Sequence, residues 1–237
     1  MSSFIPEFVG TAILIILGAG VVANVVLNKT KGNNSGWIVI TFGWAMAVYM
    51  GASASLALGG SGHLNPAVTI AMAVMTDFDS SNVLPFIAGQ FAGAIVGSII
   101  IWVAYKQHFD ETADASTQLA VFSTAPAIRN TGWNLMTEII GTFVLVLGAS
   151  LLSKPESNTG SLGALPVGLL ILAIGLSLGG PTGYAINPAR DLGPRIAHFI
   201  LPIKNKGGSD WGYSWIPVIG PIIGALIAAY VFKNFLS

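Results

Sequence analysis

The sequence of 237 residues contains no cysteine and only ten basic and ten acidic side chains. The absence of cysteine excludes disulfide bridges, thiolate metal sites and cysteine nucleophiles. Charged residues make up 8% of the chain, whereas about 25% is usual for soluble globular domains. So few charges cannot cover a surface that faces water, and the net charge of zero gives no reason to expect nucleic acid as a partner.

Hydrophobic residues are abundant instead, at 53% of the chain with a mean hydropathy of +0.74. This composition predicts a membrane protein. The opening residues, MSSFIPEF, lack the basic segment of a signal peptide, and Glu7 lies at the edge of the first apolar run. We therefore expect no cleaved leader.

Six apolar segments approach the length of roughly 20 residues that a membrane-spanning helix needs. They are 4–27, 37–58, 83–105, 133–153, 162–178 and 213–235. Two further apolar segments, 66–76 and 188–199, reach only about half the hydrocarbon thickness. Each follows an Asn-Pro pair, with asparagine (Asn65, Asn187) at the N-cap and proline (Pro66, Pro188) at the first helical position. We expect two half-helices whose asparagine amides stay free.

The chain repeats itself internally. EFVGT from Glu7 recurs as EIIGT from Glu138, and Asn-Pro-Ala recurs at 65–67 and 187–189. Each half holds three spans, so the second half must enter the membrane from the opposite side, as in inverted-repeat transporters. We expect one channel domain, 1–237, made of repeats 1–105 and 133–237 that are joined by the loop 106–132. The half-helices then enter from opposite faces, and their N-termini meet near the midplane.

Two Asn-Pro-Ala boxes, HLNPAVT and AINPARD, on such a repeat resemble those of the aquaporin superfamily. The resemblance covers essentially the whole chain. It implies an all-α membrane protein with six transmembrane helices and two re-entrant half-helices. Within the superfamily the sequence is more similar to the glycerol facilitators, because Asp191 follows Arg190 and Gly175 stands twelve residues before Asn187.

The resemblance also implies a selectivity filter. It would consist of Arg190, Gly175, Tyr184 and an aromatic residue of the second span, for which FGWAM suggests Phe42, with Trp44 as the alternative. Gly175 would leave room for a solute that is wider than water.

The short stretches before the two asparagines would supply carbonyl groups to the solute, from Gly62, His63, Leu64, Gly183 and Ala185. Glu7 and Glu138 could relay protons, but their place in the repeat favours bonds to loop N–H groups. Asp191 is expected to order the second loop rather than to bind solute.

These features predict a passive channel for glycerol, other small neutral solutes and water that excludes protons and ions. It would be no enzyme and would need no cofactor or metal. A strict water channel and a gradient-coupled transporter are the alternatives. The resemblance implies a homotetramer in the lipid bilayer of the cell membrane, with both termini in the cytoplasm.

The loop charges predict the opposite orientation. Lys154 and Lys233 fall on the side of the termini, whereas six basic residues fall on the other side: Lys29, Lys31, Lys106, Arg129, Lys204 and Lys206.

Overall fold

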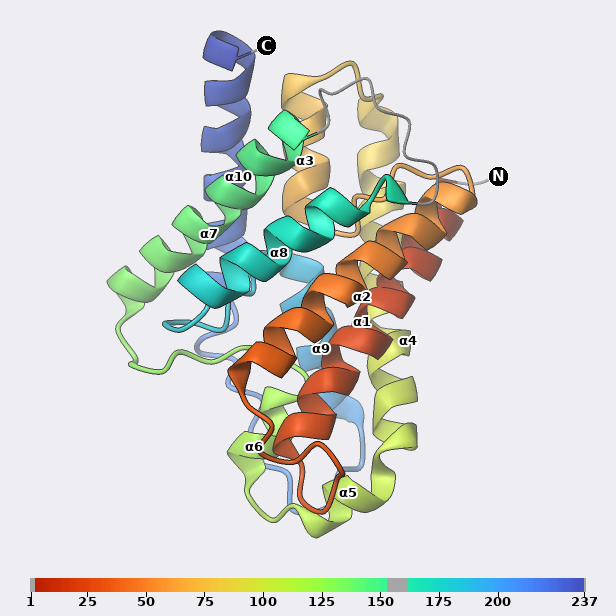
Figure 1. The fold of residues 1–237 in the computed structure, drawn as a ribbon, viewed down its shortest axis with the longest axis vertical. Coiled ribbons are helices and arrows are strands. Elements are labelled where there is room, and N and C mark those ends of the chain that lie inside the picture. The colour runs from red at the N-terminus through yellow and green to blue at the C-terminus, as the bar shows by residue number, and fades with distance from the viewer. Residues whose placement is uncertain (1–2, 153–161, 237) are drawn as a thin grey trace.

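The computed structural model describes residues 3–152 and 162–236, and in this part of the chain the regular structure is entirely helical. The long helices are α1 (Phe4–Val26), α2 (Trp37–Ala57), α4 (Val83–Ala104), α7 (Thr131–Leu152), α8 (Leu165–Leu178) and α10 (Ile216–Val231). The half-helices are α3 (Pro66–Met75) and α9 (Pro188–Ile200), and the short elements are η1 (Ser80–Asn82), α5 (Lys106–Glu111), α6 (Ala115–Ala120) and η3 (Phe232–Leu236). The predicted all-α fold is confirmed (Figure 1).

Five helical stretches of the described chain are long and apolar enough to cross a membrane. The exception is α8, with 14 residues, which is about 21 Å long. It begins later than the predicted span 162–178, because Pro166 occupies its first turn, where proline is favoured. Ser153, the predicted end of the fourth span, and Lys154 lie outside the described residues.

The predicted repeat is visible in the helix packing. Helix α1 packs against α4 in the first half, and α7 packs against α10 in the second. At both contacts a glycine lets two backbones approach: a Cβ on Gly93 would lie 2.3 Å from the Phe8 carbonyl oxygen, and one on Gly224 would lie 2.2 Å from that of Ile139. These four residues occupy corresponding positions in the two halves, so the repeat extends to the close contacts between helices.

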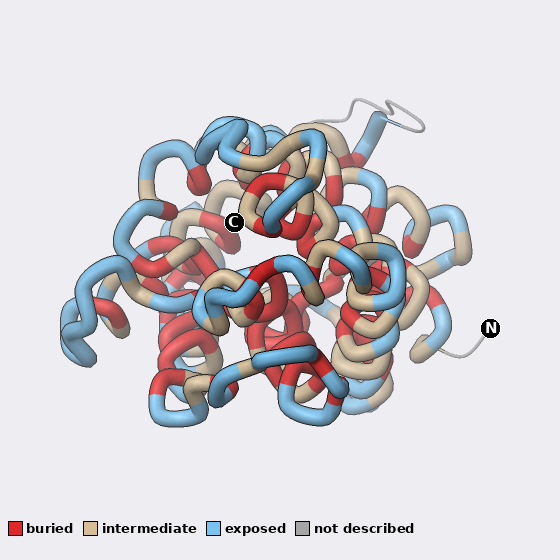
Figure 2. Tube along the Cα trace, turned by 90° about the horizontal axis from the view of Figure 1, so that it is seen from below, coloured by how far each residue is buried: buried red, intermediate tan, exposed pale blue. Residues whose placement is uncertain are grey.

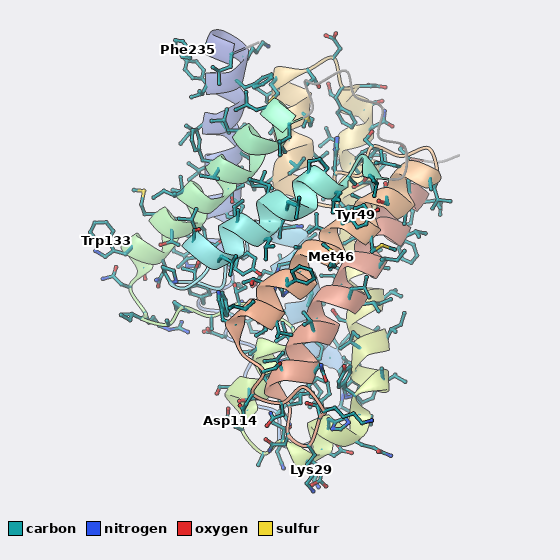
Figure 3. The ribbon with its side chains drawn as sticks, viewed as in Figure 1. Lys29, Met46, Tyr49, Asp114, Trp133 and Phe235 are labelled. Carbon is teal, nitrogen blue, oxygen red and sulfur yellow. The ribbon has the colours of Figure 1, made fainter. Side chains whose placement is uncertain are left out.

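The half-helices cross between the repeats. Helix α3 of the first half packs on α10, and α9 of the second half packs on α4. Figure 1 shows α3 in the upper part of the molecule and α9 below it, so the two together traverse the bundle. Both chain ends lie in the upper part, and Lys29 and Asp114 lie at the opposite end from Phe235 (Figure 3).

Burial follows this arrangement. Large apolar side chains such as Ile38 and Leu84 point outward, and exposed residues cover the outside of the bundle in Figure 2. The interior contains charged groups: Glu7, Glu138, Asp191 and Arg195 are all 0% exposed. Charged groups buried this deeply require hydrogen-bond or ion-pair partners. Several of these partners belong to the loops beside the functional site.

Candidate functional site

The tips of the two half-helices are joined by a reciprocal pair of hydrogen bonds. Asn65 Nδ2 donates to the Ile186 carbonyl, and Asn187 Nδ2 donates to the Leu64 carbonyl, each at 2.8 Å. The side-chain oxygens cap their own helices, since Asn65 Oδ1 accepts from Ala67 N at 2.9 Å and Asn187 Oδ1 accepts from Ala189 N at 3.0 Å. The expectation of a wholly free amide was wrong, because each amide uses one N–H group to hold the opposite tip and keeps only the second.

Two buried glutamates hold the stretches before the asparagines. Glu7 accepts hydrogen bonds from the backbone N–H groups of His63 at 3.0 Å and Leu64 at 2.7 Å. Glu138 accepts from those of Ala185 at 3.1 Å and Ile186 at 2.8 Å. Further donors are Gln90 and Ser55 on Glu7, and Thr182 on Glu138. From the internal repeat we expected both glutamates to bind loop N–H groups rather than to relay protons, and the hydrogen bonds agree with that expectation.

The loop backbone has left-handed residues at matching places. One and three positions before each asparagine, φ is positive: +52° at Leu64, +66° at Gly62, +44° at Ile186 and +39° at Tyr184. Such a conformation costs about 1–3 kcal/mol at a residue other than glycine, and the glutamate bonds offset this cost. Gly183 also has a positive φ, +79°.

The loops also leave carbonyl groups without a protein donor. Within the described chain no group donates to the carbonyls of Gly62, His63, Gly183 or Ala185. Leu64 differs from the prediction, because its carbonyl is taken by Asn187.

A cavity of about 310 Å³ runs past the tips. Its polar part includes Asn65, Asn187, Arg190 and Tyr184. The remaining lining residues are Leu14, Trp44, Val48, Ala52, Leu56, Ser61, Gly62, His63, Leu64, Val68, Met72, Leu145, Ala149, Gly163, Ala164, Val167, Ile171, Ala185 and Ile186. Of the predicted solute-facing residues, Phe42, Gly175 and Gly183 do not line this cavity.

The aromatic residue of α2 at the cavity is Trp44, and the choice of Phe42 was wrong. Phe42 is 52% exposed and Trp44 is 4% exposed. The two residues are about 200° apart around the helix, so only one can face the interior. The ring of Trp44 lies under the guanidinium of Arg190, 3.9 Å from its Cζ atom, a cation–π geometry. Gly18 admits this ring, because a Cβ there would lie 2.2 Å from Trp44 Cζ3.

The space beside Gly175 is filled by Tyr184. A Cβ on Gly175 would lie 2.9 Å from Tyr184 Cζ, 3.0 Å from its hydroxyl oxygen and 2.9 Å from Thr41 Cγ2. Trp37 donates to the Gly175 carbonyl at 3.0 Å and meets the Tyr184 ring edge-on. The glycine therefore admits a protein ring, and it widens the cavity only indirectly, by letting that ring withdraw.

Asp191 and Arg195 form a buried ion pair behind the cavity wall, with Arg195 Nη2 and Asp191 Oδ1 2.7 Å apart. Asp191 also accepts from the N–H and hydroxyl groups of Thr124, each at 2.7 Å. Nearby, Arg190 Nη1 lies 3.5 Å from the Phe122 carbonyl. Asp191 thus braces the loop 106–132 at Thr124, whereas the sequence predicted that it orders the loop before Asn187. Arg195 was missed, although an acid and a base four residues apart in an apolar helix are a usable signal.

No group of three or more histidine or carboxylate side chains is placed to hold a metal ion in the described residues. The cavity is lined instead by hydrogen-bond donors, bare carbonyls, and aromatic and aliphatic side chains. Such a lining can bind and release neutral polar solutes.

Comparison with known proteins agrees with this geometry. The family model described as "Major intrinsic protein" matches residues 1–232. The glycerol uptake facilitator protein of Streptococcus pneumoniae is 55% identical over 235 residues, 99% of this chain and 100% of the relative. The probable glycerol uptake facilitator protein of Thermotoga maritima is 55% identical over 98% of this chain and 99% of the relative.

Two more distant relatives extend the comparison. The D/L-lactic acid transporter of Lactiplantibacillus plantarum is 42% identical, over 98% of this chain and 96% of its own length. The X-ray structure of the aquaglyceroporin from Plasmodium falciparum superposes with a TM-score of 0.86 at 30% identity, over 99% of this chain and 96% of that one. The chain belongs to the major intrinsic protein family.

Proposed function

We propose that the protein is a passive channel for glycerol, water and other small neutral solutes. The observation that carries this proposal is the meeting of the Asn65 and Asn187 caps at the wall of a cavity that also holds Arg190. Relatives with the name glycerol uptake facilitator, 55% identical over nearly the whole length, support glycerol as the solute.

The first effect of the two half-helix N-termini is electrostatic repulsion of cations. Each helix N-terminus carries about half a positive elementary charge, and two such ends on one passage repel cations. The free N–H group of each asparagine amide donates to a passing oxygen atom. A water molecule held by both amides points its hydrogens away from the tips, which interrupts a proton-conducting chain, as in pores of the aquaporin type.

Trp44, Tyr184 and Arg190 form the filter in this proposal. Burying an arginine at membrane depth costs at least about 2.5–3.5 kcal/mol, and stacking on Trp44 offsets part of this cost. The guanidinium keeps donors for the hydroxyl groups of a polyol, and the two rings contact its carbon atoms. Bare carbonyls of Gly62 and Ala185 accept the hydroxyl hydrogens.

The two alternatives fit less well. A gradient-coupled transporter needs a titrating or ion-binding group, but Glu7 and Glu138 each accept two loop N–H bonds as well as side-chain bonds. A strict water channel would be expected to fill the position of Gly175 with a larger side chain that narrows the pore.

We further propose that residues 1–237 form one channel domain that assembles as a homotetramer in the cell membrane, with both termini in the cytoplasm. The family resemblance supports this orientation against the charge of the loops. Because the chain has no cysteine, a single Lys31→Cys variant can be labelled in intact cells with a membrane-impermeant maleimide. Labelling supports an external loop, and labelling that requires lysis would reverse the orientation.

Proteoliposome shrinkage tests the function. Vesicles with the protein are expected to equilibrate glycerol much faster than empty vesicles and to exclude a six-carbon polyol. Phe42→Leu is the matched control for Trp44→Leu, and only the second is expected to change the ratio of glycerol to water flux. Water flux without glycerol flux would favour the strict water channel, and flux that follows a proton gradient would favour the transporter.

A further inference from the structure

The far ends of both half-helices carry lysine ammonium groups. Lys206 Nζ donates to three carbonyls at the end of α9: His198 at 3.0 Å, Phe199 at 2.7 Å and Leu201 at 2.6 Å. At the end of α3, Lys233 Nζ donates to the Val74 carbonyl at 3.1 Å. The two lysines come from different segments, a loop and the end of the last helix, yet both cap a half-helix.

The charge of Lys206 is placed to act on the α9 dipole. A helix C-terminus carries about half a negative charge, and a lysine hydrogen-bonded to its last carbonyls more than compensates it. Lys206 is partly buried, and it forms no ion pair with a carboxylate of the described residues. The negative pole of α9 is therefore cancelled. At the positive pole, the Asp191 carboxylate of the first turn is balanced by its ion pair with Arg195, so the tip at Asn187 and Arg190 stays positive.

We propose that Lys206 and its counterpart Lys233, which lies in η3 and caps α3, are specificity-determining residues that strengthen the exclusion of protons and cations at the helix tips. This inference rests on the proposed channel function. Without these ammonium groups, the negative pole of each half-helix partly cancels the field of the positive pole. A lysine at the C-terminal end of a half-helix neutralises the negative pole, so the field of the positive pole at the tip is no longer weakened.

The distance sets the size of the effect. Helix α9 has 13 residues and is about 20 Å long. A unit charge about 20 Å away, at an effective dielectric constant of about 20, changes the occupancy of a cation at the tip by roughly fourfold. Salt reduces this effect, because the screening length falls from about 30 Å at 0.01 M to about 3 Å at 1 M.

Proton leak through a sensitised channel tests the proposal. Arg190→Val is compared with the double variant Arg190→Val/Lys206→Met in proteoliposomes with an imposed pH gradient. The double variant is expected to leak about fourfold faster per channel at low salt, with the difference shrinking at high salt. Replacing Lys206 with arginine in the same background is expected to restore the slower leak, because the charge is kept.

Lys204→Met is the matched control, because Lys204 is exposed on the same segment and its ammonium donates to no carbonyl of the described chain. Equal leak in the Arg190→Val single and double variants, including no leak in either, would overturn the proposal. The proposal would also be overturned if Lys204→Met in the Arg190→Val background raised the proton leak as much as Lys206→Met does. That result would indicate an effect of surface charge in general. Glycerol flux of the wild type and of Lys206→Met is measured in parallel, since its absence from the wild type would defeat the channel function itself.

Discussion

Adding one methyl group at Gly175 is expected to close the passage to glycerol while leaving it open to water. In Gly175→Ala the new Cβ would lie 2.9 Å from Tyr184 Cζ and 2.9 Å from Thr41 Cγ2. Ordinary carbon contacts lie at about 3.5–4.0 Å, so a neighbour must move by roughly 0.6–1 Å. Trp37 contacts Tyr184 edge-on and bonds the Gly175 carbonyl, and Tyr184 lines the cavity. Because Trp37 lies on one side of it, the Tyr184 ring is expected to move toward the passage.

The size of the effect follows from overpacking. Inserting a methyl group into a packed site typically costs about 1–3 kcal/mol. If a glycerol molecule must push the ring back, it meets a barrier of that order, and a barrier higher by about 1.4 kcal/mol lowers flux tenfold. A single file of water needs less width, so its flux is expected to fall by less than about threefold. Gly175→His is expected to act in the same direction more strongly.

Stopped-flow light scattering of proteoliposomes measures both fluxes on one preparation. Gly175→Ala combined with Tyr184→Leu is the rescue control, because a smaller side chain gives the new methyl group room. An equal fall of water and glycerol flux in Gly175→Ala would refute this reading of the filter. So would a failure of the second substitution to restore glycerol flux.

Three other outcomes are expected. Arg190→Val is expected to admit protons or cations, and an unchanged decay of an imposed pH gradient would remove its role in exclusion. Glu138→Gln turns one acceptor into a donor that faces the N–H group of either Ala185 or Ile186, so a loss of about 2–4 kcal/mol in stability is expected. A melting temperature equal to that of the wild type would contradict the role of Glu138 in holding the loop. Mercurial reagents are expected not to inhibit glycerol flux, because the chain has no thiol, and inhibition in the flux assay would require another target.

The features that the two halves share could be predicted from the sequence. Both asparagine caps and both glutamates could be placed by comparing the two halves, because the repeat gives each residue an independent copy. The half-helices could be delimited because Pro66 and Pro188 mark their first turns.

The features that the sequence did not reveal depend on tertiary contacts. Phe42 and Trp44 are both aromatic residues of one apolar helix, and only packing against Gly18 decides which ring faces the cavity. The role of Gly175 depends on a ring nine residues further along the chain. The use of one N–H group of each asparagine amide depends on how closely the tips meet, and spacing along the chain does not encode that distance.

The most direct test of the account measures solute and proton movement in the same vesicles. Proteoliposomes with an internal pH indicator receive a glycerol gradient and a pH gradient together. The account predicts that glycerol equilibrates rapidly while the pH difference persists as long as in vesicles without protein. Collapse of the pH difference at the rate of glycerol entry, or exclusion of glycerol, would contradict it.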